Sequence, residues 1–252
     1  YGKVQNILKN RKYNLCSVYY NANAIQGNTF YKFYIASVYP NSKLITHQHG
    51  AGYGVDYDLC DENYERSVSD KFYTFGWSDG SDTEYAPFEK LSKKYNNNGQ
   101  NILLVLTNGP LYPSRLFYMP MATELIKNTV HSASKFLNLV EDFSIRVRFS
   151  PNESGWAIRE RVKKKTQFFS ESTKSFYSEF DSSKIIIMEN LGTAFYESMS
   201  MNKPIIVFIN KDICKFRQCA IQYFKALEDV GILHYSAESA AKHFKSIKYN
   251  VD

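Results

Sequence analysis

Short apolar runs alternate with helix-like segments through the second half of the chain. Each run is bounded by turn residues, which predicts a buried strand. The predicted strands lie at 101–107, 143–149, 184–188, 204–209 and 232–235. The segments between them predict helices, because their apolar residues recur on one face or their ends carry capping residues. The predicted helices lie near 120–138, 155–165, 170–179, 193–201, 213–230 and 237–247.

The first half of the chain is less regular. The runs Lys43–Thr46 and Asp70–Trp77 predict strands, and residues 1–12 predict a helix. The stretch Thr29–Val38 fits either a helix or a strand. Residues 78–99 are rich in Gly, Ser, Asp and Asn, a composition typical of a linker.

Strands that alternate with helices predict an α/β protein with a parallel sheet flanked by helices. We expect residues 99–252 to form a complete Rossmann-like domain. Residues 1–98 are expected to hold the C-terminal part of a preceding α/β domain, followed by the linker.

Two of the predicted strands end in glycine-rich turns. The strand at 43–46 runs into His47-Gln48-His49-Gly50-Ala51-Gly52-Tyr53-Gly54, and the strand at 184–188 is followed by Asn190-Leu191-Gly192-Thr193. Glycine lets the backbone turn tightly and approach a ligand closely. Open α/β sheets bind ligands at the carboxyl ends of their strands. The two turns therefore predict a cleft for a phosphorylated or anionic ligand.

Composition narrows the classes of protein. The chain has 252 residues, of which 44% are hydrophobic, enough for a sizeable core. No apolar run reaches the roughly 18 residues that a bilayer requires. The net charge of +6 is read chiefly as a Lys-rich solvated surface. The alternative is attraction for anionic ligands, lipid head groups or nucleic acid.

The cysteines indicate the compartment. Cys16, Cys60, Cys214 and Cys219 show no C-x-x-C spacing, so they predict neither a disulfide framework nor a zinc site. This pattern favours a reducing, cytoplasmic location. The chain opens at Tyr1 without an initiator Met or a signal-peptide pattern and is read as a piece of a longer protein.

Several segments, in their order and spacing, carry a resemblance to a known family. They are His49-Gly50-x-Gly52-Tyr53-Gly54, Ser69-Asp70-Lys71-Phe72, Gly76-Trp77, Arg146 to Gly155-Trp156, Gly192-Thr193-Ala194-Phe195-Tyr196-Glu197-Ser198, Asn202-Lys203-Pro204-Ile205-Ile206 and Tyr223 to His243. Together they resemble the surface-polysaccharide (O-antigen type) transferases of bacterial cell envelopes, which have a GT-B architecture. More distantly they are similar to capsule Kdo transferases and sialyltransferases.

The resemblance implies a glycosyltransferase that moves a sugar from a nucleotide-activated donor, CMP- or UDP-linked, to a glycan or lipid-linked glycan acceptor. It implies two Rossmann-like domains, with the donor bound chiefly by the C-terminal one, and no metal or other cofactor. It also implies work in the cytoplasm at the inner membrane face. The basic block 159–165 is either an exposed helix face or a peripheral contact with anionic lipid. Nucleic acid is not expected, because the aromatic residues are spread through core-like strands.

Each group needed for glycosyl transfer has a candidate. A helix that opens at Gly192-Thr193 offers backbone N–H groups to the leaving phosphate, beside Asn190. By resemblance, Glu197 binds a ribose or sugar hydroxyl; otherwise it is a solvated helix residue. Arg146 and Arg148 precede Ser150-Pro151, where the distant relatives carry a His-Pro motif against the phosphate. They either supply that positive charge or form surface ion pairs.

The catalytic candidates lie in the first half. His49 is predicted to be a base, or a donor to a phosphate or carboxylate, or a histidine that buttresses the turn formed by Gly50 and Gly52. His47 shares its strand face, but spacing places no third ligand, so no metal site is predicted. Tyr53 is a candidate to stack on or bond the ligand.

Asp70 is predicted either to close the cleft as a catalytic group or to cap a neighbouring turn. Glu62 and Glu65 are alternative bases. Two other function classes stay open, a nucleotide-sugar epimerase and a non-catalytic nucleotide- or glycan-binding module.

Overall fold

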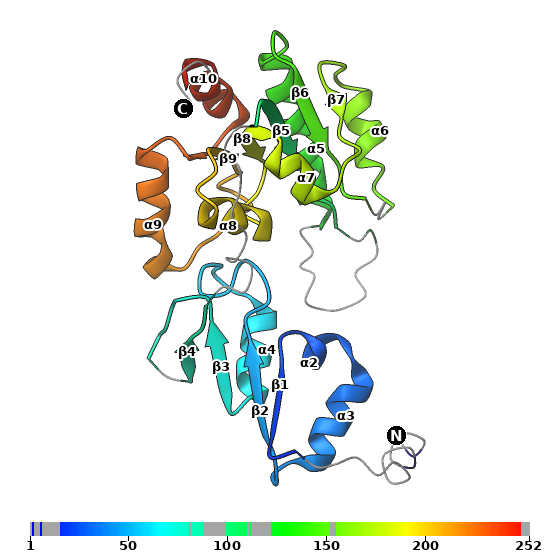
Figure 1. The fold of residues 1–252 in the computed structure, drawn as a ribbon, viewed down its shortest axis with the longest axis vertical. Coiled ribbons are helices and arrows are strands. Elements are labelled where there is room, and N and C mark those ends of the chain that lie inside the picture. Colours follow the sequence, from blue (N-terminus) through cyan, green and yellow to red (C-terminus); the bar gives the residue numbers. More distant parts are fainter. Residues whose placement is uncertain are drawn as a thin grey trace. The chain divides into compact units, whose positions relative to one another are not determined.

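The computed structural model describes residues 2, 6, 16–80, 82–87, 99–109, 111, 122–151 and 155–247. The chain divides into two compact units. Unit 1 comprises residues 1–54 and 58–89, and unit 2 comprises residues 55–57 and 90–252. Figure 1 shows the elements of both units, coloured from blue to red along the chain.

Unit 2 contains a six-stranded parallel sheet. Its strands are β5 (Asn101–Val105), β6 (Ile145–Arg148), β7 (Ser170–Glu171), β8 (Ser183–Met188), β9 (Ile205–Phe208) and β10 (Leu233–His234). The order across the sheet is β10-β9-β8-β5-β6-β7. The chain thus builds outward from β5 in one direction, returns to the other side of β5 and builds outward again. This is the strand order of the doubly wound Rossmann fold.

Helices cover both faces of this sheet. They are α5 (Ala122–Leu139), α6 (Ile158–Lys163), α7 (Phe176–Asp181), α8 (Thr193–Ser200), α9 (Gln218–Asp229) and α10 (Ala237–Ile247). One apolar cluster joins α5, α6 and α10 to the sheet through residues such as Phe136, Val162 and Phe244. A second cluster joins α7, α8 and α9 to the opposite face, around Phe180, Phe195 and Phe224. Strands buried on both faces explain the continuous apolar runs of the sequence.

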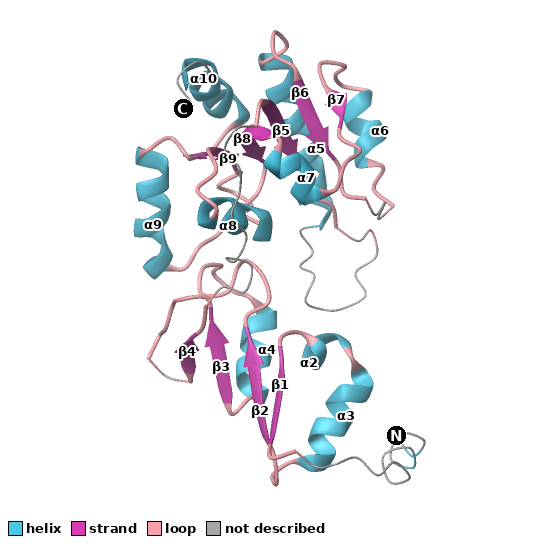
Figure 2. Ribbon diagram, viewed as in Figure 1, coloured by secondary structure: helices cyan, strands magenta, loops and turns pink. Residues whose placement is uncertain are grey.

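Unit 1 contains a four-stranded parallel sheet in sequential order. Its strands are β1 (Val18–Asn21), β2 (Lys43–His47), β3 (Lys71–Thr74) and β4 (Thr83–Tyr85), which Figure 2 shows side by side in magenta. The helices are α2 (Ala24–Gly27), α3 (Thr29–Val38) and α4 (Cys60–Val68). Leu44, Thr46, Phe72 and Thr74 alternate along β2 and β3 and are buried. Both units are therefore parallel-sheet α/β structures flanked by helices, consistent with the Rossmann-like, GT-B-type fold expected.

Thr29–Val38 is a helix, which resolves the choice left open by the sequence. Asn28 caps this helix by accepting the backbone N–H of Tyr31 at 3.0 Å. The helix expected at residues 1–12 falls, apart from residues 2 and 6, outside the described residues.

Four elements of unit 1 were not predicted: β1, α2, α4 and β4. The acidic helix α4 escaped notice because it buries Glu62 and Glu65, so its inner face does not look apolar. β4 lies within the expected linker and pairs with β3 at the edge of the sheet. Its Glu84 and Tyr85 are exposed, so it lacks the apolar signature of a strand.

Two predicted helices of unit 2 were wrong in their bounds. The stretch 170–179 begins as strand β7, which pairs with β6, and becomes helical only after the N-cap Ser175. α9 begins at Gln218 rather than at 213. The preceding backbone is engaged elsewhere, because Arg217 donates its N–H to the carbonyl of Val55 at 2.8 Å and Asp56 forms a β-bridge with Phe216.

Candidate functional site

The strand order of unit 2 reverses between β5 and β8, and this point marks the first candidate site. In doubly wound folds the crevice for a nucleotide opens at the carboxyl ends of the two strands that flank the reversal. Here β5 leads into Thr107 and Asn108, and β8 leads into Glu189 and Asn190. These residues are called the β5/β8 edge below.

Glu189 ties the two strand ends together. Its Oε1 accepts the backbone N–H of Thr107 at 2.6 Å, and its Oε2 accepts the hydroxyl of Thr129 on α5 at 2.9 Å. The side chain is buried, and burial raises the pKa of its carboxyl group against the lowering effect of these hydrogen bonds. Glu189 is therefore a fixed structural acceptor at the edge, and the sequence analysis did not single it out.

Asn190 shapes the turn that leads into α8. Its Nδ2 donates to Oγ1 of Thr107, and its Oδ1 accepts the backbone N–H of Gly192 at 3.0 Å. Gly192 is the N-cap of α8 and provides no side-chain cap. The structure thus brings three predicted residues, Asn190, Gly192 and Thr193, to the amino end of one helix, where backbone N–H groups favour an anion.

Glu197 lies on the same helix but is almost fully buried, with 4% of its surface exposed. Its placement differs from that of a solvated helix residue. Ser198 beside it is also buried and donates its hydroxyl to the carbonyl of Ala194 at 2.6 Å. The inner face of α8 is therefore partly polar.

A small hollow of about 40 Å³ lies beside the β5/β8 edge, between the ends of β5 and β6. It is lined by Leu106, Thr107, Asn108, Phe149, Ser150, Pro151, Ile158 and Arg159. Arg159 reaches it from α6, with its guanidinium 5.5 Å from the ring centre of Phe149 and its Nε 2.9 Å from Glu171. Ser150-Pro151 therefore lies at the carboxyl edge of the sheet, as its place after a strand predicts.

The two arginines of β6 are engaged within unit 2. Arg146 donates from Nη2 to Oε1 of Glu179 on α7 at 2.6 Å, and Glu179 is fully buried. Arg148 donates from Nη1 to the carbonyl of Lys174 at 2.8 Å, and its guanidinium lies 5.7 Å from the ring centre of Phe176. These contacts match the ion-pair interpretation of Arg146 more closely than the phosphate-binding one.

A second candidate site lies in unit 1, at the carboxyl end of β2. Nδ1 of His49 is 2.9 Å from the hydroxyl of Tyr53, and that hydroxyl donates to Oε2 of Glu65 at 2.9 Å. Nδ1 of His49 is also 3.5 Å from Oε1 of Glu65. His49 is 26% exposed, whereas the Glu65 side chain is fully buried on α4. Two predicted site residues, His49 and Tyr53, thus contact each other directly, and both contact Glu65, which the sequence offered only as an alternative base.

The glycine turn around these residues is held by Gln48. Its Oε1 accepts from the backbone N–H of Phe75 and from Nε1 of Trp77, both at 2.9 Å, and its Nε2 donates to the carbonyl of Gly50 at 2.9 Å. Gly52 has a φ of 91°, a conformation that glycine adopts without strain. Gln48 therefore fixes the turn that carries His49 to the loop after β3, a role that no sequence pattern marked.

Asp70 and His49 lie at opposite ends of the strands of the unit 1 sheet. Asp70 precedes β3, and its Oδ2 accepts the backbone N–H of Leu44, near the start of β2, at 2.8 Å. His49 follows the end of β2, five residues further on, which at roughly 3.3 Å per residue is about 16 Å away. The structure thus gives Asp70 the capping contact and does not bring it to His49.

His47 packs against aromatic rings. It is buried, with its ring 5.0 Å from that of Phe75 and 6.2 Å from that of Tyr20. Within the described ranges, no group of three or more His, Cys, Asp or Glu side chains is arranged to hold a metal ion. In the same part of the chain, no helix is long and apolar enough to cross a bilayer.

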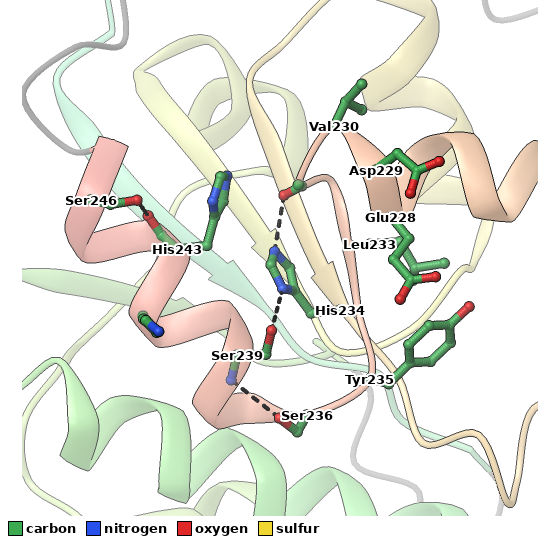
Figure 3. A pocket seen from close by; sticks show the side chains of 12 residues that line it. Glu228, Asp229, Val230, Leu233, His234, Tyr235, Ser236, Ser239, His243 and Ser246 are labelled. Atoms are coloured by element: carbon green, nitrogen blue, oxygen red, sulfur yellow. Dashed lines mark hydrogen bonds between the residues drawn. The ribbon is translucent and has the colours of Figure 1, made fainter.

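Unit 2 also has an open groove of about 670 Å³ along its edge strand β10, shown in Figure 3. His234 lies in its floor, with Nε2 2.9 Å from the carbonyl of Gly231 and Nδ1 2.8 Å from the hydroxyl of Ser239. Burial lowers the pKa of His234, so the ring is neutral near pH 7. None of the predicted site residues lines this groove.

Comparison with known proteins gives a family. The family model described as the LIC12162 family transferase matches residues 1–252, the whole chain. No curated protein matches the sequence.

Proposed function

The chain belongs to the LIC12162 family of transferases, and on that premise we propose that it is a glycosyltransferase. The proposed donor is a nucleotide-activated sugar, CMP- or UDP-linked. The proposed acceptor is a surface-polysaccharide or O-antigen precursor, either a glycan or a lipid-linked glycan. The reaction needs no metal or other cofactor in this proposal.

The reversal of strand order between β5 and β8 is the observation that carries the proposal. It supports a nucleotide site at the β5/β8 edge, because Rossmann-like sheets bind nucleotides where their strand order reverses. α8 begins directly after β8 there, and the first turn of a helix offers N–H groups and a favourable dipole to a phosphate. A leaving nucleotide gains negative charge during glycosyl transfer, so this edge supports both binding and departure.

His49 is proposed as the base that accepts the proton of the acceptor hydroxyl. Its imidazole is partly exposed, and its Nδ1 is fixed by the hydroxyl of Tyr53. A ring held through one nitrogen presents the other in a defined direction. A base near pH 7 suits an alcohol nucleophile, because histidine changes charge in that range.

The cytoplasm is the proposed compartment, with peripheral contact at the inner membrane face. Exposed cations on and just after α6, namely Arg161, Lys163, Lys164 and Lys165, support this part of the proposal. Anionic lipid attracts such clusters at short range, and salt weakens the attraction.

Thermal-shift measurements with CMP, UDP, GDP and TDP sugars test the donor assignment. We expect one nucleotide class to raise the melting temperature, because a ligand stabilises the folded state that binds it. Asn190→Ala is expected to abolish the shift. Asn101→Ala is the matched control, since Asn101 lies at the opposite edge of β5 and bonds Ser182.

The proposal fails if no nucleotide sugar shifts the melting temperature of the protein. It also fails if Asn190→Ala keeps the full shift while Asn101→Ala loses it, because the ligand would then bind at the amino edge of the sheet.

A further inference from the structure

Glu65 is a buried acid with an incomplete set of hydrogen bonds. Its Oε2 accepts the hydroxyl of Tyr53 at 2.9 Å. Its Oε1 receives no hydrogen bond from any residue that the structure describes, and lies 3.5 Å from Nδ1 of His49. A buried carboxylate normally accepts several hydrogen bonds or pairs with a cation. The cation within reach is the imidazolium that His49 forms on protonation.

The direction of the hydrogen bonds sets the tautomer of His49. Burial, followed by the charge of Glu65, raises the pKa of Tyr53 well above its ordinary value, so the phenol keeps its proton. The phenol donates that proton to Glu65, so its oxygen accepts from Nδ1–H of His49. Neutral His49 therefore carries its proton on Nδ1 and its lone pair on Nε2.

We propose that Glu65 is a positioning residue that shares one proton with His49 and becomes its counter-ion when His49 acts as a base. This inference rests on the proposed function for its catalytic meaning. The shared proton and the tautomer are properties of the protein alone.

The surroundings of Glu65 favour such sharing. Its own helix α4 adds Asp61 and Glu62, both acidic, and Arg66, whose Nη1 donates to Glu62 at 3.1 Å. α2 contributes the amide of Gln26, which lies 3.4 Å from the hydroxyl of Tyr53. The buried residues of β2 and β3 on this side are Leu44, Thr46, Phe72 and Thr74, and none of them ionises. His49 is therefore the group in contact with Glu65 that can become a cation by taking up a proton.

Burial raises the pKa of Glu65 to about 8, and the neighbouring charges of Asp61 and Glu62 add to the effect. Glu65 and His49 then titrate as a coupled pair, whose apparent pKa values belong to the pair and to neither residue alone. Near pH 7 the pair holds one titratable proton, and above a pH of about 8 it loses that proton.

The step starts from the pair after it has released its shared proton to solvent, with His49 neutral and Glu65 a carboxylate. The O–H bond of the acceptor breaks, its proton moves to Nε2 of His49, and the oxygen's electron pair forms the new bond to the anomeric carbon. The bond from that carbon to the leaving phosphate breaks, and its electrons go to the phosphate oxygen. His49 becomes an imidazolium, whose charge the Glu65 carboxylate balances. The proton later returns to solvent.

¹⁵N NMR of the histidine rings tests the inference without any substrate. The chain has five histidines, and the His49 signals are assigned by their loss in His49→Gln. In the wild-type protein we expect neutral His49 to be the Nδ1–H tautomer and its signals to show a titration step near pH 8. Glu65→Gln is expected to remove that step and to lower the apparent pKa of His49 by about one unit or more, the effect of losing an opposite charge at this range.

Glu62→Gln is the matched control, a buried acid on the same helix whose carboxylate accepts the backbone N–H of Gly54 at 2.8 Å and Nη1 of Arg66 at 3.1 Å. It is expected to keep the step near pH 8, moved downward by the loss of one neighbouring charge. The inference is overturned if His49 is the Nε2–H tautomer, or if Glu65→Gln leaves its titration as in the wild type. The tautomer is read from the wild-type protein without the Glu65→Gln variant, so it still decides the test if Glu65→Gln fails to fold.

Donor binding in the thermal-shift experiment separates the two proposals. A protein that binds no nucleotide sugar, yet shows the tautomer and the coupled titration, contradicts the proposed function and leaves the proton sharing intact. A protein that binds the donor but shows an uncoupled His49 supports the proposed function and contradicts the proton sharing.

Discussion

The backbone N–H of Thr107 donates a 2.6 Å hydrogen bond to Oε1 of Glu189, which lies 82 residues further along the chain. This bond joins the carboxyl ends of β5 and β8, the two strands between which the sheet reverses its order. The carboxylate is buried and fully engaged, so it acts as a fixed part of the edge. The residues that follow it, Asn190 to Thr193, are thereby held at the opening where we propose that the donor binds.

Replacement of Glu189 by alanine is expected to destabilise unit 2. The backbone N–H of Thr107 and the hydroxyl of Thr129 would each lose a buried partner, at about 1–3 kcal/mol per group. Glu189→Gln should cost much less, because its amide oxygen still accepts one of these bonds. Urea unfolding of both variants measures the difference. Equal losses for Ala and Gln would show that charge, and not hydrogen bonding, matters at this position.

Replacement of Arg146 by methionine is expected to lower the free energy of unfolding by about 3 kcal/mol, because the buried carboxylate of Glu179 loses its partner. The double variant Arg146→Met with Glu179→Met should recover much of this loss. Donor binding, measured by calorimetry, should stay near the wild-type affinity in the double variant. A large loss of affinity in that variant would instead assign Arg146 to the donor phosphate, the alternative that the sequence left open.

The turn that carries His49 and the loop after β3 each provide a glycine of a matched pair. Gly54 and Gly76 both have positive φ, 72° and 93°. A Cβ on Gly54 would lie 2.6 Å from the ring of Trp77, whereas one on Gly76 meets nothing within 4 Å. We expect Gly54→Ala to lower stability more than Gly76→Ala and to displace Trp77. Each substitution also carries the strain of a left-handed alanine, roughly 1 kcal/mol.

Tryptophan fluorescence measures this displacement directly. The chain has two tryptophans, Trp77 and Trp156, so the Trp156→Phe background isolates the signal of unit 1. Equal fluorescence and equal stability in the two alanine variants would contradict the close approach of Gly54 to Trp77.

The stability of unit 1 is expected to fall as pH rises from about 4.5 to 8. Burial raises the pKa of Glu65 to about 8 in the folded state, whereas it is ordinary in the unfolded chain. The folded state therefore binds more protons over this range, and its advantage is fully present below the unfolded pKa and lost as pH rises through the folded one. The upper limit is about 1.4 kcal/mol per pH unit.

Urea unfolding of the Trp156→Phe protein between pH 5 and pH 9 measures this dependence. Adding Glu65→Gln should flatten the profile, because glutamine does not titrate. A wild-type profile that rises between pH 5 and pH 8 would contradict the raised pKa.

The sequence predicted the elements of unit 2 well, for a physical reason. Its strands are buried on both faces, so runs such as Ile185–Met188 are apolar throughout and end at clear turn residues. The same pattern placed Asn190 and Gly192 at a strand end. What the pattern does not contain is the order of strands, which alone shows that β5 and β8 are neighbours.

Unit 1 was harder to predict because its informative residues are polar and buried. α4 turns Glu62 and Glu65 inward, so the periodicity of its inner face is acidic. Gln48 forms three hydrogen bonds that fix the turn, yet glutamine between two histidines carries no pattern of its own. The role of Asp70 depends on whether it lies at the amino or the carboxyl ends of the parallel strands, and the sequence pattern does not give the strand direction.

Backbone amide NMR with the stabilising nucleotide sugar tests the central claim most directly. The account predicts that the largest shift changes fall on Thr107, Asn108, Asn190, Gly192 and Thr193. Changes confined to the groove along β10, at residues such as Gly231 and His243, or to the amino edge at Asn101 and Ser182, would contradict it.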